Sequence, residues 1–181
     1  AAPGAPDLWL LGSSGYSAML AAQLGLPFSY AHFIQPIDGA EVGAAYRARF
    51  QPTDANPEPY LTIGVSVLVA DDAEEARRLT SSLRLWRRRL MTKGEGGPIP
   101  SVAEALADPQ SGPQRERGRR PSRRLVAGTG AEVRTQLIEL AEAYGADEVL
   151  AVTICHDHQA RRRSYELLAE AFELAPVPTH P

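Results

Sequence analysis

Residues 6–28, PDLWLLGSSGYSAMLAAQLGLPF, decide the fold class. The mostly apolar residues 7–11 predict a short buried strand, and Gly-Ser-Ser-Gly at 12–15 predicts a turn. Apolar residues at helical spacing over 16–24 predict a helix, and a second apolar run at 26–33 predicts another strand. A strand, a helix and a further strand in this order form the unit from which parallel sheets are built.

The same alternation continues to the end of the chain, which predicts an α/β fold with parallel strands. The four expected core strands cover residues 7–11, 26–33, 60–69 and 147–154, and none alternates strictly, as expected for strands covered on both faces. The other predicted elements are helices over 40–50, 72–92, 130–144 and 158–174, and a brief extended piece over 124–128. Asp72 with Glu75, and Thr129 with Glu132, have the spacing of capping boxes at helix N-termini.

Two segments lack the signals of regular structure. Residues 93–123 contain KGEGGPIP and DPQSGPQ and predict a mobile loop, although residues 101–107 could hold one or two helical turns. Residues 175–181, APVPTHP, predict an irregular tail.

Composition narrows the class of protein. The 181 residues are 44% apolar and 23% charged, with a formal net charge of -3, so we expect neither nucleic acid nor a membrane as a partner. No apolar run approaches the roughly 20 residues that cross a bilayer. A single cysteine and the absence of a secretory signal at the start of the sequence predict a cytoplasmic protein.

The Gly-Ser-Ser-Gly turn has two interpretations. Ligands of βα proteins gather beyond the carboxyl ends of the strands, and the N-terminus of a helix offers unpaired N–H groups to an anion. Glycine lets the backbone approach a phosphate closely and serine adds hydroxyl donors, so the turn is a candidate phosphate site. In the alternative, Ser13 or Ser14 only caps the helix while Gly12 and Gly15 form the turn. The spacing is that of neither a P-loop nor a dinucleotide fingerprint.

Four stretches resemble the luciferase-like, flavin-dependent monooxygenases, whose members include alkanal monooxygenase. They are PDLWLLGSSGYSAMLAAQLGLPFSYAHF, AYRARFQP, ADDAEEA and the run VAGTGAEVRTQLIELAEAYGADEVLAVTICHDHQARRRSYELLAEAF, and they occur in order along the chain. The resemblance implies a (β/α)8 TIM-type barrel that binds reduced FMN and uses O2 to oxidise an aldehyde or another small organic substrate. It also implies that a separate reductase can supply the reduced FMN.

Carried over to this sequence, the family's phosphate-binding turn falls on residues 13–17. The resemblance implies that Ser14 and Ser17 contact the FMN phosphate, with Ser13 and the backbone around Gly15 and Tyr16 beside them.

The resemblance also implies that only the C-terminal half of a barrel is present, as a single partial-barrel domain over residues 1–181. Four strands in 181 residues compare with roughly 250 residues for a complete barrel. We expect a fragment of a longer enzyme, a chain that pairs with a separate N-terminal half, or a homo-oligomer. The corresponding alternative function is a non-catalytic half-barrel module, and a flavodoxin-like phosphate binder would require a fifth strand that the sequence does not predict.

Three further features contain residue types that could take part in catalysis or in binding a metal or a charged partner. His32 ends the second predicted strand and is a candidate proton donor or shape element beside the flavin, or else simply a hydrogen-bonded histidine. Residues 155–158, Cys-His-Asp-His, lack the second ligand pair of a structural zinc site, so no metal is expected, and Asp157 is predicted to cap the last helix. The arginine-rich residues 115–124 lie where the family has a mobile loop that shields the flavin from water, and are predicted to be a solvated charge run.

Overall fold

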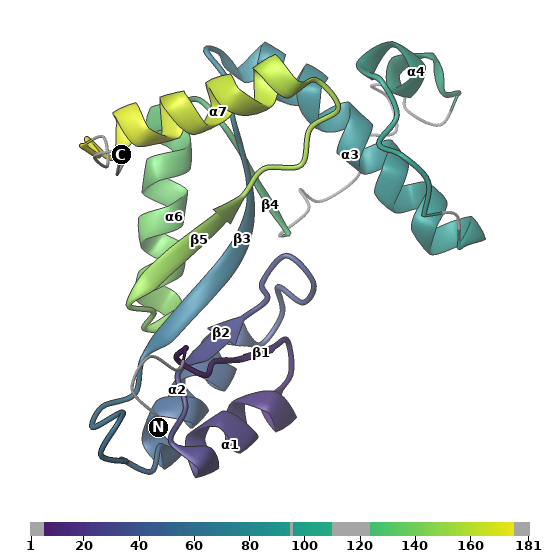
Figure 1. Cartoon of the computed structure of the whole chain (residues 1–181). Coiled ribbons are helices and arrows are strands. Elements are labelled where there is room, and N and C mark those ends of the chain that lie inside the picture. Colours follow the sequence, from purple (N-terminus) through teal and green to yellow (C-terminus); the bar gives the residue numbers. More distant parts are fainter. Residues whose placement is uncertain (1–5, 95, 110–123, 176–181) are drawn as a thin grey trace. The chain divides into compact units, whose positions relative to one another are not determined.

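The computed structural model describes residues 6–94, 96–109 and 124–175 (Figure 1). The elements follow the order β1 (Leu10–Gly12), α1 (Gly15–Leu24), β2 (Phe28–Tyr30), α2 (Gly39–Arg49), β3 (Leu61–Val69), α3 (Ala73–Lys93), α4 (Val102–Ala107), β4 (Leu125–Gly128), α6 (Gly130–Tyr144), β5 (Glu148–Val152) and α7 (His158–Ala171). The predicted helices are confirmed to within three residues at each end. The predicted strands 7–11, 26–33 and 147–154 are shorter than expected.

Packing divides the described residues into two units, one within residues 1–66 and 137–152 and the other within 67–136 and 153–181. In the first unit the strands run parallel, with β2 between β1 and β3 and with β5 on β3. Leu10 pairs with Phe28, Phe28 with Leu61, and Ile63 with Val149. The parallel α/β fold class is thereby confirmed.

The strand count of four is wrong, because the sheet has a fifth strand, β4, next to β3 in the strand order. The main-chain N–H of Ala70, just past β3, donates to the carbonyl of Gly128 at 3.0 Å. The sequence predicts only a brief extended piece over 124–128, because five residues are too few to show a period.

Burial also differs between the strands. All nine residues of β3 are buried, as the sequence predicts. In contrast, Leu11 of β1 is 66% exposed and Leu150 of β5 is 44% exposed, so the expectation that every core strand is covered on both faces is wrong for these two. Each of them pairs with one strand only among the described residues, β1 with β2 and β5 with β3.

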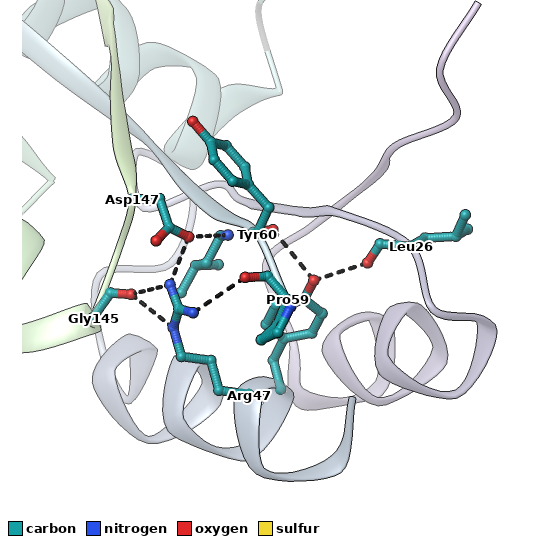
Figure 2. A network of polar contacts seen from close by, with 8 residues as sticks. Leu26, Arg47, Pro59, Tyr60, Gly145 and Asp147 are labelled. Atoms are coloured by element: carbon teal, nitrogen blue, oxygen red, sulfur yellow. Dashed lines mark hydrogen bonds and ion pairs between the residues drawn. The ribbon is translucent and has the colours of Figure 1, made fainter. Parts of the chain in front are cut away.

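A polar cluster joins α2 to the amino ends of β3 and β5 in the first unit (Figure 2). The Arg47 guanidinium donates to the carbonyl of Gly145 at 2.7 and 2.9 Å and to that of Pro59 at 3.2 Å, and it pairs with Asp147 at 2.6 Å. The same Asp147 oxygen accepts the main-chain N–H of Leu61 at 2.7 Å. These bonds fix the amino ends of the strands, which in βα proteins is the end opposite the ligand site.

In the second unit α3 is capped at its first residue and packs through its first turns. Asp72 caps α3 by accepting the Glu75 N–H at 2.8 Å, while the Glu75 carboxylate pairs with Arg78 instead of completing a capping box. Leu79 is buried in a cluster with Leu68, Ala70 and Ala76. The apolar face of α3 does not reach the end of the helix, however, since Leu90 is 38% exposed.

Several predictions concern residues outside this description. Outside the described residues lie the arginines from 115 to 123, residues 110–123 of the predicted mobile loop and residues 176–181 of the tail.

The helical turns predicted over 101–107 are confirmed as α4, which Ser101 caps by accepting the Glu104 N–H at 3.1 Å. Among the described helices, none combines the length and the apolar character that crossing a membrane requires.

Candidate functional site

The site is built at the corner where β1 ends and α1 begins. Ser14 is the N-cap of α1 with extended backbone angles, and Gly15 is the first helical residue. The first N–H groups of a helix have no acceptor within it, and the aligned peptide dipoles place partial positive charge there. The corner therefore presents hydrogen-bond donors and a positive potential at the carboxyl end of a parallel strand.

Ser14 and Ser17 form a reciprocal capping box at this corner. The Ser14 hydroxyl accepts the Ser17 N–H at 3.3 Å and the Ser17 hydroxyl accepts the Ser14 N–H at 3.4 Å. These two bonds are long. The two hydroxyl oxygens lie 3.2 Å apart, and the Ser17 hydroxyl donates to the Ser14 carbonyl at 2.8 Å. Ser14 is thus shown to cap α1, and phosphate binding at the same turn stays a prediction. Ser14 is exposed and Ser17 is half-buried.

Two glycines shape the corner in different ways. A Cβ on Gly12 would lie 2.1 Å from the Ser17 Oγ, so the absence of a side chain there lets α1 start close to β1. A Cβ on Gly15 would meet nothing within 4 Å, so the space beside the first turn of α1 is open. Tyr16 is 79% exposed and Ser13 is half-buried. The residues from 13 to 17 thus fit a phosphate group, which needs donors and room next to the backbone.

His32 lies two residues beyond β2 and is buried, with 3% of its surface exposed. Its Nδ1 is 2.8 Å from the hydroxyl of Tyr144, the last residue of α6. Burial, with smaller effects of Tyr30 and Asp38, raises the pKa of Tyr144 to about 12. The structure therefore places His32 in a polar pair inside the first unit, and its role beside a flavin stays a prediction.

The Cys-His-Asp-His segment forms the turn that leads into α7. Asp157 caps this helix by accepting the Ala160 N–H at 2.7 Å, as predicted. His156 Nδ1 lies 2.8 Å from the carbonyl of Ile99, and burial raises the pKa of the Cys155 thiol. Across the residues described by the structure, no group of three or more His, Cys, Asp and Glu side chains is arranged to hold a metal ion.

The sequence alone assigns no role to residues 163–165 of α7, and two of these side chains bond to the main chain of the second unit. The Ser164 hydroxyl accepts the main-chain N–H of Val69 at 2.8 Å, and the Tyr165 hydroxyl accepts that of Thr153 at 3.1 Å. Arg163 pairs with Asp71 at 2.7 Å. Helical spacing does not predict these bonds, because their acceptors or donors lie far along the chain or outside the helix.

Parallel strands joined by helices define the class as an α/β protein, and the candidate anion site lies after the first strand. The sequence profile of the luciferase-like monooxygenases matches residues 1–148. The chain belongs to the luciferase-like monooxygenase family.

Individual relatives agree with this assignment. The uncharacterized protein YwcH of Bacillus subtilis (strain 168) is 38% identical over 171 residues, which make up 93% of this chain and 50% of YwcH. The luciferase-like monooxygenase of Escherichia coli (strain K12) is 34% identical over 167 residues, 92% of this chain and 49% of its own length.

Solved structures give the same picture of the fold. Apo-MsnO8 matches 98% of this chain with a TM-score of 0.87 and 42% identity, and 54% of that chain is covered. The oxygenating constituent of 3,6-diketocamphane monooxygenase, solved in complex with FMN, matches with a TM-score of 0.54 at 20% identity, which shows the fold alone. The chain spans about half the length of the curated relatives it matches. The expectation that the chain corresponds to half of a luciferase-like TIM-type barrel is thereby confirmed.

Proposed function

We propose that this chain is the C-terminal part of an FMN-dependent monooxygenase that acts on an aldehyde or another small organic substrate. The observation that carries the proposal is the corner of β1 and α1, where the exposed Ser14, the half-buried Ser17, the open space at Gly15 and the start of a helix come together. Family membership supports FMN as the anionic ligand, since a protein of this fold is known in complex with FMN.

Main-chain and side-chain donors of the corner would both bind the phosphate. The backbone N–H groups of Gly15 and Tyr16, at the first turn of α1, point along the helix axis toward an anion. The hydroxyls of Ser14 and Ser17 can turn from their mutual bonds to donate to phosphate oxygens, while Ser13 borders the site. Hydrogen bonds to a charged group are roughly twice as strong as neutral ones, so this exchange is favourable.

Bound reduced FMN would supply the electrons that reduce O2 during the oxidation of the substrate, and a separate reductase would supply the reduced flavin. The part of this chain is to bind the phosphate end and thereby orient the ring system. His32 is the candidate proton donor beside the ring.

We further propose that the active protein needs a second barrel half, either a preceding segment, a separate chain or another copy. Support comes from the exposed Leu11 and Leu150 on β1 and β5, and from the coverage of only half of each curated relative. Exposed apolar strands favour association. If the chain instead acts as a non-catalytic half-barrel module, it will associate in the same way without binding FMN.

The test compares FMN with riboflavin, which lacks the phosphate, in a fluorescence-quenching titration of the purified chain. We expect tighter binding of FMN than of riboflavin, and we expect the double substitution Ser14→Ala with Ser17→Ala to remove most of that difference. Ser101→Ala, which removes the hydroxyl cap of α4, is the matched control and should leave both affinities unchanged. Equal affinity for FMN in the wild type and the double variant would refute the phosphate assignment.

A further inference from the structure

His32 and Tyr144 are 112 positions apart in the sequence, yet they form one of the buried side-chain hydrogen bonds of the first unit. Both are almost fully buried, with 3% and 5% of their surfaces exposed. Their rings meet edge to face with centroids 5.6 Å apart. The bond therefore has a defined geometry and is shielded from water.

The direction of this hydrogen bond follows from the phenol. A buried hydroxyl that leaves its proton without an acceptor is destabilising, so we expect the Tyr144 O–H to donate. The bond to His32 Nδ1 is the one hydrogen bond that the described part of the chain gives to this hydroxyl. Since burial raises the pKa of Tyr144 to about 12, the phenol keeps its proton at neutral pH.

We infer that Tyr144 is a positioning residue that holds His32 neutral, with Nδ1 as an acceptor and the ring proton on Nε2. A neutral imidazole that accepts at one nitrogen must carry its proton on the other. An imidazolium would donate from Nδ1 as well, and the Tyr144 proton would then lose its acceptor. His32 then carries its one ring proton on Nε2.

The surroundings of Tyr144 preserve this arrangement. A Cβ on Gly39, the first residue of α2, would come within 2.3 Å of three atoms at the hydroxyl end of the ring. The Tyr30 ring packs against the Tyr144 ring with their centroids 5.6 Å apart, and the Tyr30 hydroxyl donates to the Gln35 carbonyl at 2.9 Å. Tyr30 and the carboxylate of Asp38 are the titratable groups whose charge acts on Tyr144, and both favour the protonated phenol.

The inference deepens the proposed function, because it specifies how the candidate donor His32 is prepared. The tautomer exists without flavin, however, so it is measured independently of FMN binding. Two-bond ¹H–¹⁵N correlation spectra of the chain at pH 8 report which ring nitrogen carries the proton, and His32→Asn identifies the signals of His32 among the four histidines.

We expect the wild-type spectrum to show His32 as the Nε2–H tautomer. In Tyr144→Phe we expect the population of the Nδ1–H tautomer to rise at least several-fold, because Nδ1 no longer accepts a hydrogen bond from the phenol. Tyr46→Phe is the matched control: it removes another buried phenol of the same unit, one that donates to the carbonyls of Leu26 and Tyr60, and it should leave His32 unchanged.

Two results would overturn the inference. One is a wild-type His32 that carries its proton on Nδ1, which decides the question even if Tyr144→Phe does not fold. The other is a folded Tyr144→Phe whose His32 signals match those of the wild type. A failure of the chain to bind FMN would contradict the proposed function and leave the tautomer measurement intact.

Discussion

Gly15→Ala separates the phosphate-binding role of the β1–α1 corner from its structural role. A Cβ at this position contacts nothing within 4 Å in the protein, so the substitution introduces no clash. Because alanine is the better helix former by up to about 1 kcal/mol, we expect the free energy of unfolding to stay the same or to rise.

Binding of FMN should change in the opposite direction. The added methyl group occupies the open space beside the first-turn N–H groups, and a phosphate must then give up at least one charge-assisted hydrogen bond. Such a bond contributes about 1.5–3 kcal/mol, which corresponds to a loss in FMN affinity of about 10- to 150-fold. Riboflavin affinity should remain unchanged, because riboflavin has no phosphate.

Gly12→Ala provides the contrast. Its Cβ would lie 2.1 Å from the Oγ and 2.4 Å from the Cβ of Ser17, so α1 must move away from β1. We expect a destabilisation of about 1–3 kcal/mol in urea unfolding, in line with other overpacked sites. FMN titration and urea unfolding on both variants complete the comparison. A stable Gly15→Ala variant that binds FMN within twofold of the wild type would show that no phosphate lies beside this residue.

Three further predictions concern stability and titration. Asp147→Ala removes the acceptor of the Leu61 N–H, so we expect the free energy of unfolding in urea to fall by about 1–2 kcal/mol, a figure discounted for partial exposure. Asp147→Asn keeps an amide oxygen as an acceptor and should lower it less. Equal losses in the two variants would contradict this account of the cluster. The Thr129 N–H and hydroxyl lower the pKa of Glu132 in the folded protein below its ordinary value of 4.5. The stability that the carboxylate contributes is therefore complete above pH 4.5 and is lost as the pH falls through the lowered pKa. Glu132→Gln should accordingly reduce the change in urea midpoint between pH 7 and pH 3. Tyr144, with its pKa raised to about 12, should ionise late in a phenolate absorbance titration while stability declines above pH 10, and Tyr144→Phe should remove this late step.

Local signals allowed much of the fold to be predicted from the sequence. The bounds of α6, 130–144, agree with the prediction because a Thr129–Glu132 capping box and a terminal Gly145 at φ 59° mark both ends. Strand ends were harder to predict, since they depend on a partner far along the chain. The run of apolar residues continues to position 33, but β2 ends at Tyr30, the last residue that pairs with β3.

The candidate site was predictable in its position and not in its packing. Gly-Ser-Ser-Gly after an apolar run indicates the corner by itself. The contact of Gly12 with Ser17 depends on the angle at which α1 leaves β1, which no spacing rule supplies. The bond between His32 and Tyr144 joins residues 112 positions apart, so only the folded chain could reveal it.

The most direct test of phosphate binding at the start of α1 is an amide ¹H–¹⁵N titration of the chain with FMN and, separately, with riboflavin. We predict that the N–H resonances of residues 14–17 shift with FMN and respond much less to riboflavin. Shifts caused by FMN that bypass residues 14–17 and gather elsewhere would contradict the account.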